Sequence, residues 1–212
     1  YDWFANTPGA SSPDDWTDRS ISDVTVTTAT MFDLNASAEL LKLEKIAFRA
    51  VIGFKQDSWV WDDKAYDYVY SSSSFRDTVG SFGGQNVIDY EQTITIPYLG
   101  FSANGLVGPV DVGAYLLYSP SVSAEDKDYH ILRDIHFEET FSGGNYIALG
   151  INATYRISDA LFVSAALDYQ SIPEIAGDME YTGPTGVTQS AENTAGLSNK
   201  LLMFSGTVGY NF

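Results

Sequence analysis

Apolar and polar residues alternate with a period of two along most of the chain. In MFDLNASAEL (31–40), Phe32 and Leu34 fall on one face, and Asp33 and Asn35 fall on the other. An α-helix would repeat near 3.6 residues, so this period predicts β-strands. The pattern predicts about seven strands, near residues 20–40, 44–61, 88–102, 110–119, 145–156, 161–170 and 198–212.

The direction of the apolar face separates two all-β architectures. A soluble sandwich would turn that face inward, whereas a transmembrane antiparallel β-barrel turns it toward lipid. Three features favour the barrel. The strands are long enough to cross a bilayer, the chain ends on an aromatic residue in phase with the apolar face, and short connections alternate with long polar ones. The long connections are expected at 57–87, 120–145 and 170–198.

The barrel hypothesis assigns each side chain to lipid or to the interior. The positions expected to meet lipid are Phe32, Leu34, Leu40, Ile94, Ile96 and Tyr98, and those expected inside are Asp33, Asn35, Thr93 and Thr95. Inside the barrel, Asp33 and Glu39 are expected to pair with Arg49 and Lys55 on the next strand.

An odd number of strands does not close a bacterial barrel, because both chain ends lie on one side of the membrane. A seven-stranded sheet would also leave two unpaired edges in lipid. We therefore expect residues 1–212 to form a single barrel domain whose first strands precede Tyr1.

The charge of the chain restricts its partners. The formal net charge is −17, from 28 acidic and 11 basic residues, and there is no cysteine. Binding to nucleic acid is unfavourable on this charge, and basic partners are favoured. Without cysteine, neither disulfides nor thiolate metal sites can form.

One of the expected loops carries candidate chemistry. In SAEDKDYHIL (123–132), Asp128 and His130 are two residues apart and share a face if the segment is a strand. A carboxylate beside an imidazole orients it and stabilises its cation, as a general base requires. The alternative is a solvated polar rim. The second histidine, His136, is expected on the strand surface.

Several stretches, in order along the whole chain, resemble the omptin family of outer-membrane endopeptidases. They are YDW, WTDRS, FDLN, VYSSSSFRDTVGSF, IPYLG, DKDYH, NYIALGINATY and AGLSNKLLMFSGTVGYNF. The resemblance implies a barrel of ten strands when complete, of which this chain holds about seven.

The resemblance also implies a site at the outer rim. Asp128 and His130 match the family's Asp–His pair, and Asp2 matches one residue of the facing aspartate pair. The attacking water would lie between them, with no metal or cofactor. Asp126 matches an acid that lines the pocket for a basic side chain, and Asp18 falls near the cleft.

The chain departs from the family at its lipid site. Omptins commonly carry Tyr-x-Glu-x-Arg on the outside of a strand, where it binds lipopolysaccharide phosphates. The matching positions are Phe54, Gln56 and Ser58, and a further basic position is Thr93. Without cations, this surface loses the charge-assisted bonds that hold phosphate.

Two functions from different classes follow. The first is an endopeptidase of the bacterial outer membrane that faces the cell exterior and cleaves peptides at basic residues. The second is a catalytically inactive omptin-like barrel that serves as a structural or adhesive component of the envelope. A passive pore fits less well, because barrels of this size fill their interior with side chains.

Overall fold

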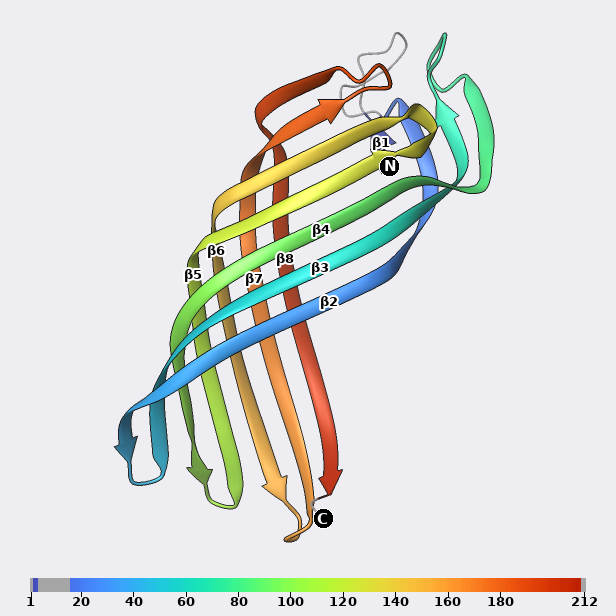
Figure 1. Ribbon diagram of the computed structural model, residues 1–212. Coiled ribbons are helices and arrows are strands. Elements are labelled where there is room, and N and C mark those ends of the chain that lie inside the picture. The colour runs from blue at the N-terminus through green and yellow to red at the C-terminus, as the bar shows by residue number, and fades with distance from the viewer. Residues whose placement is uncertain (1, 4–15, 211–212) are drawn as a thin grey trace.

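The protein folds into one antiparallel sheet whose strands follow each other in chain order (Figure 1). The computed structural model describes residues 2–3 and 16–210. No helix in this described part is long and apolar enough to span a membrane. The strands are β1 (Asp2–Trp3), β2 (Asp18–Leu43), β3 (Ile46–Tyr70), β4 (Thr78–Val107), β5 (Val110–His130), β6 (Ile135–Arg156), β7 (Leu161–Thr182) and β8 (Thr188–Tyr210), and a short 3-10 turn, η1 (Ile131–Arg133), joins β5 to β6.

The seven long strands are confirmed, but they extend far beyond the predicted ranges. Each has between 21 and 30 residues, whereas about 9–11 suffice to cross a bilayer. Most of the expected loops at 57–87, 120–145 and 170–198 are therefore strand, and this prediction was wrong. The outward face becomes polar in these extensions, so the apolar alternation that predicted strands fades there.

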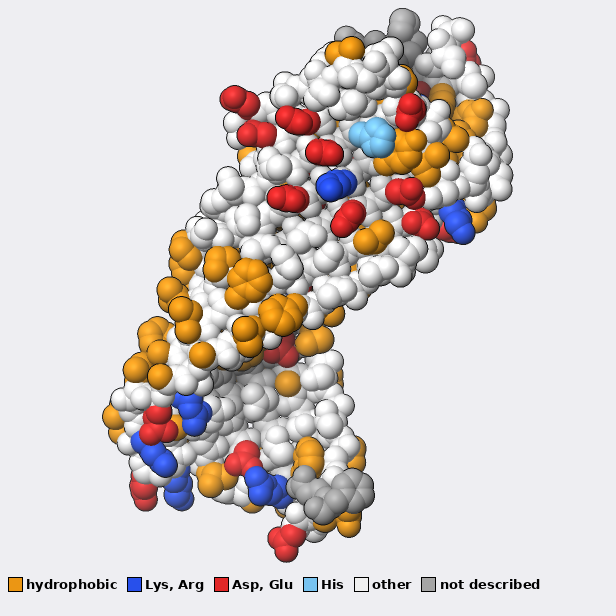
Figure 2. Space-filling view, viewed as in Figure 1, with side chains coloured by type: hydrophobic (Ala, Val, Ile, Leu, Met, Phe, Trp, Pro, Cys, Tyr) orange, Lys and Arg blue, Asp and Glu red, His pale blue; other side chains and the backbone are white. Residues whose placement is uncertain are grey.

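The outward face carries a belt of exposed apolar side chains along the membrane-crossing part of the strands (Figure 2). Leu34 is 64% exposed, and Phe32 and Leu40 on the same strand are also exposed. Asp33 lies on the opposite, concave face, where its carboxylate accepts a hydrogen bond from Tyr98. The assignment of faces is thus confirmed for β2.

The assignment of faces for β4 was wrong. Ile94, Ile96 and Tyr98 are 2%, 1% and 5% exposed and belong to the apolar core on the concave side. Thr93 and Thr95, which were expected inside, lie on the outward face with Pro97 and Leu99. The remaining members of the core are Val122, Ala124, Phe141, Tyr146, Ala148, Ile172, Ile175 and Leu197. This packing fills part of the interior, which disfavours the passive pore.

Two glycines let tyrosine rings lie across the inner surface. A Cβ on Gly53 would come within 2.3 Å of the Tyr98 ring, and one on Gly150 within 2.3 Å of the Tyr115 ring. The two hydroxyls reach carboxylates at 2.6 Å, from Tyr98 to Asp33 and from Tyr115 to Asp168. Each ring crosses the strand that carries the glycine, and a larger side chain at that position would displace the ring.

The prediction of ion pairs from Asp33 and Glu39 to Arg49 and Lys55 was wrong, because none of them forms among the described residues. The register places Asp33 opposite Lys55, and Glu39 opposite Arg49. The Lys55 Nζ nevertheless lies 3.0 Å from a carboxylate oxygen of Asp57 and donates to Gln170 at 2.8 Å. Arg49 donates to Asn104 at 2.7 Å. The inner face is polar around Lys55 and Arg49, but these side chains bond to residues other than those opposite them in the register.

The edges of the sheet differ in their pairing. Within the described residues, β2 pairs with β1 over two positions only, and β8 pairs only with β7. Whether further strands precede Tyr1 stays a prediction.

The packing of β4 predicts which side chains meet lipid. Because the chain has no cysteine, single cysteines can be introduced without background. We expect a lipid-soluble thiol reagent to label cysteine at Leu34 and Leu99 but not at Ile96. An arginine at Leu99 should cost about 2–4 kcal/mol if this residue lies at the bilayer midplane. Labelling at Ile96 but not at Leu99 would show that Ile96 faces lipid and would contradict this assignment of the β4 faces.

Candidate active site

The upper end of β5 carries three ionisable side chains on the concave face. Asp126, Asp128 and His130 alternate along the strand, so the pleat turns all three the same way. The Nε2 atom of His130 lies 3.1 Å from Oδ2 of Asp128, and their side chains are 18% and 25% exposed. The sequence prediction that these two residues share a face is confirmed. Phe137 on β6 meets the His130 ring edge-on, with centroids 5.2 Å apart.

Asp126 lies one pleat below Asp128 and is almost fully buried, at 4% exposure. The Tyr90 hydroxyl donates to its Oδ2 at 2.5 Å, and the Gln92 amide donates to the same oxygen at 3.3 Å. Trp61 stacks on the Tyr90 ring at 4.4 Å, which fixes the position of that hydroxyl. The other carboxylate oxygen, Oδ1, is buried and has no partner among the described residues. A buried carboxylate with a free lone pair favours binding of a cation.

A second carboxylate strengthens this preference. Glu139 on β6 is opposite Asp126 in the register. Burial raises the pKa of Asp126, against the hydrogen bonds from Tyr90 and Gln92, which lower it. Burial also raises the pKa of Glu139, and the charges of Asp126 and Asp128 raise it further. Within residues 16–210, no group of three histidine, aspartate or glutamate side chains is placed to hold a metal ion.

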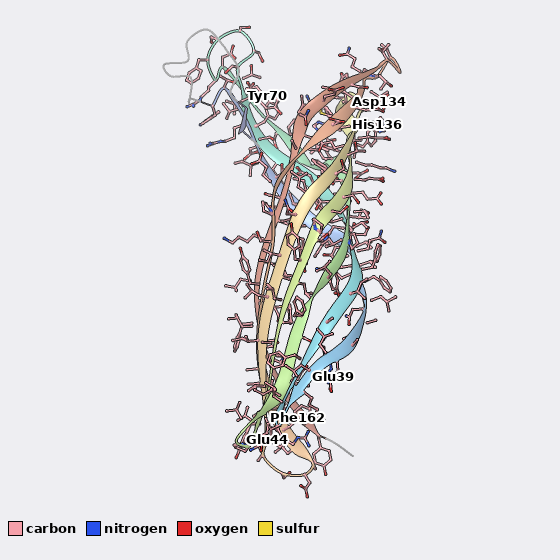
Figure 3. The ribbon with its side chains drawn as sticks, turned by 90° about the vertical axis from the view of Figure 1, so that its left-hand side faces the viewer. Glu39, Glu44, Tyr70, Asp134, His136 and Phe162 are labelled. Atoms are coloured by element: carbon pink, nitrogen blue, oxygen red, sulfur yellow. The ribbon has the colours of Figure 1, made fainter. Side chains whose placement is uncertain are left out.

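A cleft of about 730 Å³ opens beside His130. Asp18, Ser20 and Tyr70 line it from β2 and β3, and His130 and Arg133 line it from β5 and η1. Figure 3 shows the two arms of the molecule, with Tyr70 on one and Asp134 and His136 on the other. The structure therefore brings Asp18 and His130, two residues expected near the active cleft, into one cavity.

The Asp18 carboxylate is held in place by neighbouring groups. The backbone N–H of Ser71 donates to its Oδ1 at 3.0 Å, and the Thr17 hydroxyl donates to its Oδ2 at 2.7 Å. Asp2 lies in β1, where its backbone pairs with that of Arg19. This pairing places the Asp2 backbone beside the strand that carries Asp18. The side chain of Asp2 lies outside the described part, and its role stays a prediction.

Four residues of this region were missed by the sequence analysis. Tyr90 and Glu139 flank Asp126, and Arg133 lies against His130, with NH2 2.9 Å from Nδ1. Asp63 is 1% exposed, and in the part of the chain that the structure describes neither of its carboxylate oxygens has a partner. It is opposite Ile88 on β4, which is in turn opposite His130. A β5–β6 hairpin register around 131–134 could have identified Glu139, but residues 120–145 were expected to be a loop.

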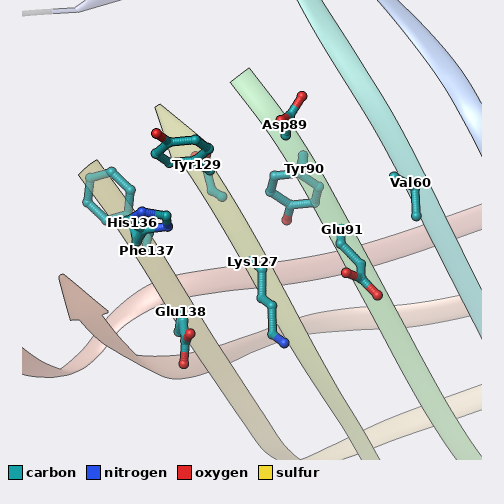
Figure 4. Close-up of a pocket in the computed structure, with 10 residues that line it drawn as sticks. Val60, Asp89, Tyr90, Glu91, Lys127, Tyr129, His136, Phe137 and Glu138 are labelled. Carbon is teal, nitrogen blue, oxygen red and sulfur yellow. The ribbon is translucent and has the colours of Figure 1, made fainter. Parts of the chain in front are cut away.

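The outward face of the same strands carries a separate hollow of about 260 Å³ (Figure 4). His136 stacks on the Tyr129 ring at 4.1 Å, and its side chain is 52% exposed. Lys127 lies among the acids that line this hollow, which are Asp89, Glu91, Asp128 and Glu138. His136 is thus separated from His130 by the sheet, as its predicted position on the strand surface requires.

The four positions matching the family's lipid site lie on the outer surface of β3 and β4. Gln56 donates to Thr95 at 3.3 Å, and Thr93 donates to Ser58 at 3.3 Å. Phe54 is exposed on the same face. None of these four side chains carries a charge.

Known proteins share this architecture. Residues 1–212 match the Omptin family. The plasminogen activator of Yersinia pestis is 29% identical over 216 residues, and outer membrane protease OmpP of Escherichia coli (strain K12) is 27% identical over 216 residues. Each alignment covers 100% of this chain and 67% of the relative.

A solved structure agrees with these sequence matches. The crystal structure of outer membrane protease OmpT from Escherichia coli matches with a TM-score of 0.82 at 24% identity, over 95% of this chain and 70% of that one. The strand order and concave inner face described above are therefore those of part of an omptin barrel. With the family match extending over the whole sequence, this chain belongs to the omptin family of outer-membrane proteases.

Proposed function

We propose that this protein is an endopeptidase of the bacterial outer membrane that cleaves peptides beside basic residues. The observation that carries this proposal is the 3.1 Å contact between His130 Nε2 and Asp128 Oδ2 on the concave face, with His130 lining the cleft. Asp–His pairs of this kind activate water as a nucleophile.

The proposed reaction uses His130 as the general base. A carboxylate only accepts hydrogen bonds, so Nε2 carries the proton donated to Asp128 and Nδ1 carries the lone pair. Nδ1 takes a proton from water as the water oxygen attacks the scissile carbonyl carbon. Asp128 stabilises the resulting imidazolium, which then returns the proton to the leaving amine. Asp2, on the facing rim by resemblance, would position the water.

Asp126 is proposed to bind the basic side chain of the substrate. Its Oδ1 has no partner within residues 16–210, and Glu139 adds negative charge beside it. Asp18, on the other side of the cleft, would meet substrate residues beyond the scissile bond. The net charge of −17 attracts cationic peptides over a longer range.

The membrane part of the proposal concerns lipids and orientation. We propose that the apolar belt contacts outer-membrane lipid and that the cleft faces the cell exterior. Phe54, Gln56, Ser58 and Thr93 provide no cation for lipopolysaccharide phosphates, so activity should not need that lipid at this surface. An inactive barrel with a structural or adhesive role is the alternative, and the first experiment below decides between the two.

Replacing the base should abolish hydrolysis without unfolding the barrel. We expect His130→Ala to lower kcat/KM by about 10²–10⁴-fold, the usual contribution of a general base. The assay is cleavage of a quenched dibasic peptide by the complete encoded protein in detergent micelles. His136→Ala, on the opposite face, is the matched control and should be nearly silent. Full activity of His130→Ala would end the proposed mechanism, and an inactive wild type in several lipids would favour the structural alternative.

Removing the charge of Asp126 should change specificity more than turnover. A hydrogen bond to a charged partner contributes about 1.5–3 kcal/mol, so Asp126→Asn should lower kcat/KM for a lysine substrate by roughly 10–100-fold. Cleavage of the same peptide with norleucine should change little. Glu125→Gln, on the outward face of the same strand, is the control. Equal losses for the lysine and norleucine peptides would contradict the subsite.

The preference for lysine over norleucine should also depend on pH. The pKa of Asp126 is raised, so the carboxylate becomes ionised only above the usual aspartate range, and the preference should appear as pH rises through that higher value. Tyr90→Phe removes a hydrogen bond that lowers this pKa, so the midpoint should move further upward. The measurement is the ratio of kcat/KM for the two peptides against pH. A midpoint that moves downward in Tyr90→Phe would refute the assignment.

A further inference from the structure

Arg133 lies against the one nitrogen of His130 that can accept a proton. It ends the 3-10 turn η1, which begins immediately after His130. Its NH2 group is 2.9 Å from Nδ1, and a guanidinium can only donate, so it donates to the Nδ1 lone pair. On the other side of the ring, Asp128 accepts from Nε2. The resting base is therefore bonded at both nitrogens, and Arg133 occupies the place where the attacking water must bind.

The charges around the cleft also bear on the role of Arg133 in the reaction. Attack of water on a carbonyl carbon places negative charge on the carbonyl oxygen, and a preorganised donor must stabilise it. Asp18 lines the cleft, and Asp126 and Asp128 lie on β5, which ends at His130. None of these carboxylates can stabilise an anion. Arg133 is the only cationic side chain among the described residues that line the cleft.

Arg133 also has unused capacity for hydrogen bonding. A guanidinium carries five N–H donors, and within residues 16–210 only the bond to His130 is formed. The side chain is exposed at the end of a three-residue turn, so it can move by a few ångströms without moving a strand. Asp134, which follows, turns the chain into β6 with φ of 51°.

We propose that Arg133 is a further catalytic residue that binds the scissile carbonyl oxygen and stabilises the tetrahedral oxyanion. This inference rests on the proposed peptidase function. When substrate enters, its carbonyl oxygen takes over the guanidinium donors, and Nδ1 becomes free for water. The water oxygen then bonds to the carbonyl carbon, its proton goes to Nδ1, and the C=O electron pair moves to the oxygen beside Arg133. Collapse of this oxyanion breaks the C–N bond as Nδ1 protonates the leaving amine.

Kinetics of Arg133 variants give the first test. We expect Arg133→Ala to lower kcat by about 10²–10³-fold, the usual loss for one oxyanion donor, with a smaller change in KM. Arg133→Lys keeps the charge without the planar fork and should recover part of that loss. The control is Arg156→Ala, because Arg156 is an exposed arginine paired with Asp111 at the far end of β6. Unchanged kcat in Arg133→Ala would overturn the proposal.

Binding of two inhibitors separates an oxyanion role from support of the His130 ring. The first is a dibasic peptide with a phosphinate at the scissile position, which is tetrahedral and anionic. The second has an alkene there and lacks the oxygen. Arg133→Ala should weaken phosphinate binding by about 10²–10³-fold and leave alkene binding unchanged. Equal losses for both, or none for the phosphinate, would refute the role of Arg133.

The inhibitor experiment does not depend on turnover. If the wild type cleaves no peptide but binds the phosphinate through Arg133, the anion site stands and the proposed function fails. If the wild type cleaves peptides but Arg133→Ala binds the phosphinate as tightly, the function stands and this inference fails.

Discussion

The constraint on which the rest of the structure depends is the alternation of side chains along strands of more than 20 residues. In the membrane-crossing part, this alternation sends Leu34 outward and Asp33 inward. At the rim, the same pleat turns Asp126, Asp128 and His130 toward the concave face, where His130 lines the cleft. A one-residue slip of β5 would move all three to the outward face, so the register of the sheet fixes the site as firmly as it fixes the lipid surface.

The sequence predicts strands better than it predicts which way they face. Period two identified β4, but Ile94 and Ile96 face inward, because the interior at this depth is itself an apolar core. Polar and apolar residues alternate there in the same way whether the core or lipid receives the apolar set. Strand pairing decides the matter, since Tyr98 must share a face with Asp33 to donate to it. Such information lies in contacts between residues far apart in the chain.

The candidate site was likewise predicted only where local spacing determines which residues share a face. The spacing of Asp128 and His130 predicted that they share a face if the segment is a strand, and the structure shows that they are in contact. Tyr90 and Glu139 reach Asp126 from the two neighbouring strands, and only the register reveals them. Arg133 was missed for a different reason, since its contact depends on the path of a three-residue turn. Local spacing identifies two residues that share a face of one strand. The residues around them are placed by the pairing of strands and by the path of turns.

The acidity that would capture a basic substrate also opposes the reaction. Two residues of a strand advance roughly 6.6 Å, so a cation held at Asp126 lies one pleat from the Asp128–His130 pair. A carboxylate about 7 Å from a developing oxyanion disfavours it by about 2 kcal/mol at an effective dielectric constant of about 20. Asp126 and Asp128, on the strand that ends at His130, would add penalties of this order, so a cleft that attracts cations needs a permanent positive charge at the carbonyl oxygen. The position of Arg133, 2.9 Å from the base nitrogen, meets that need.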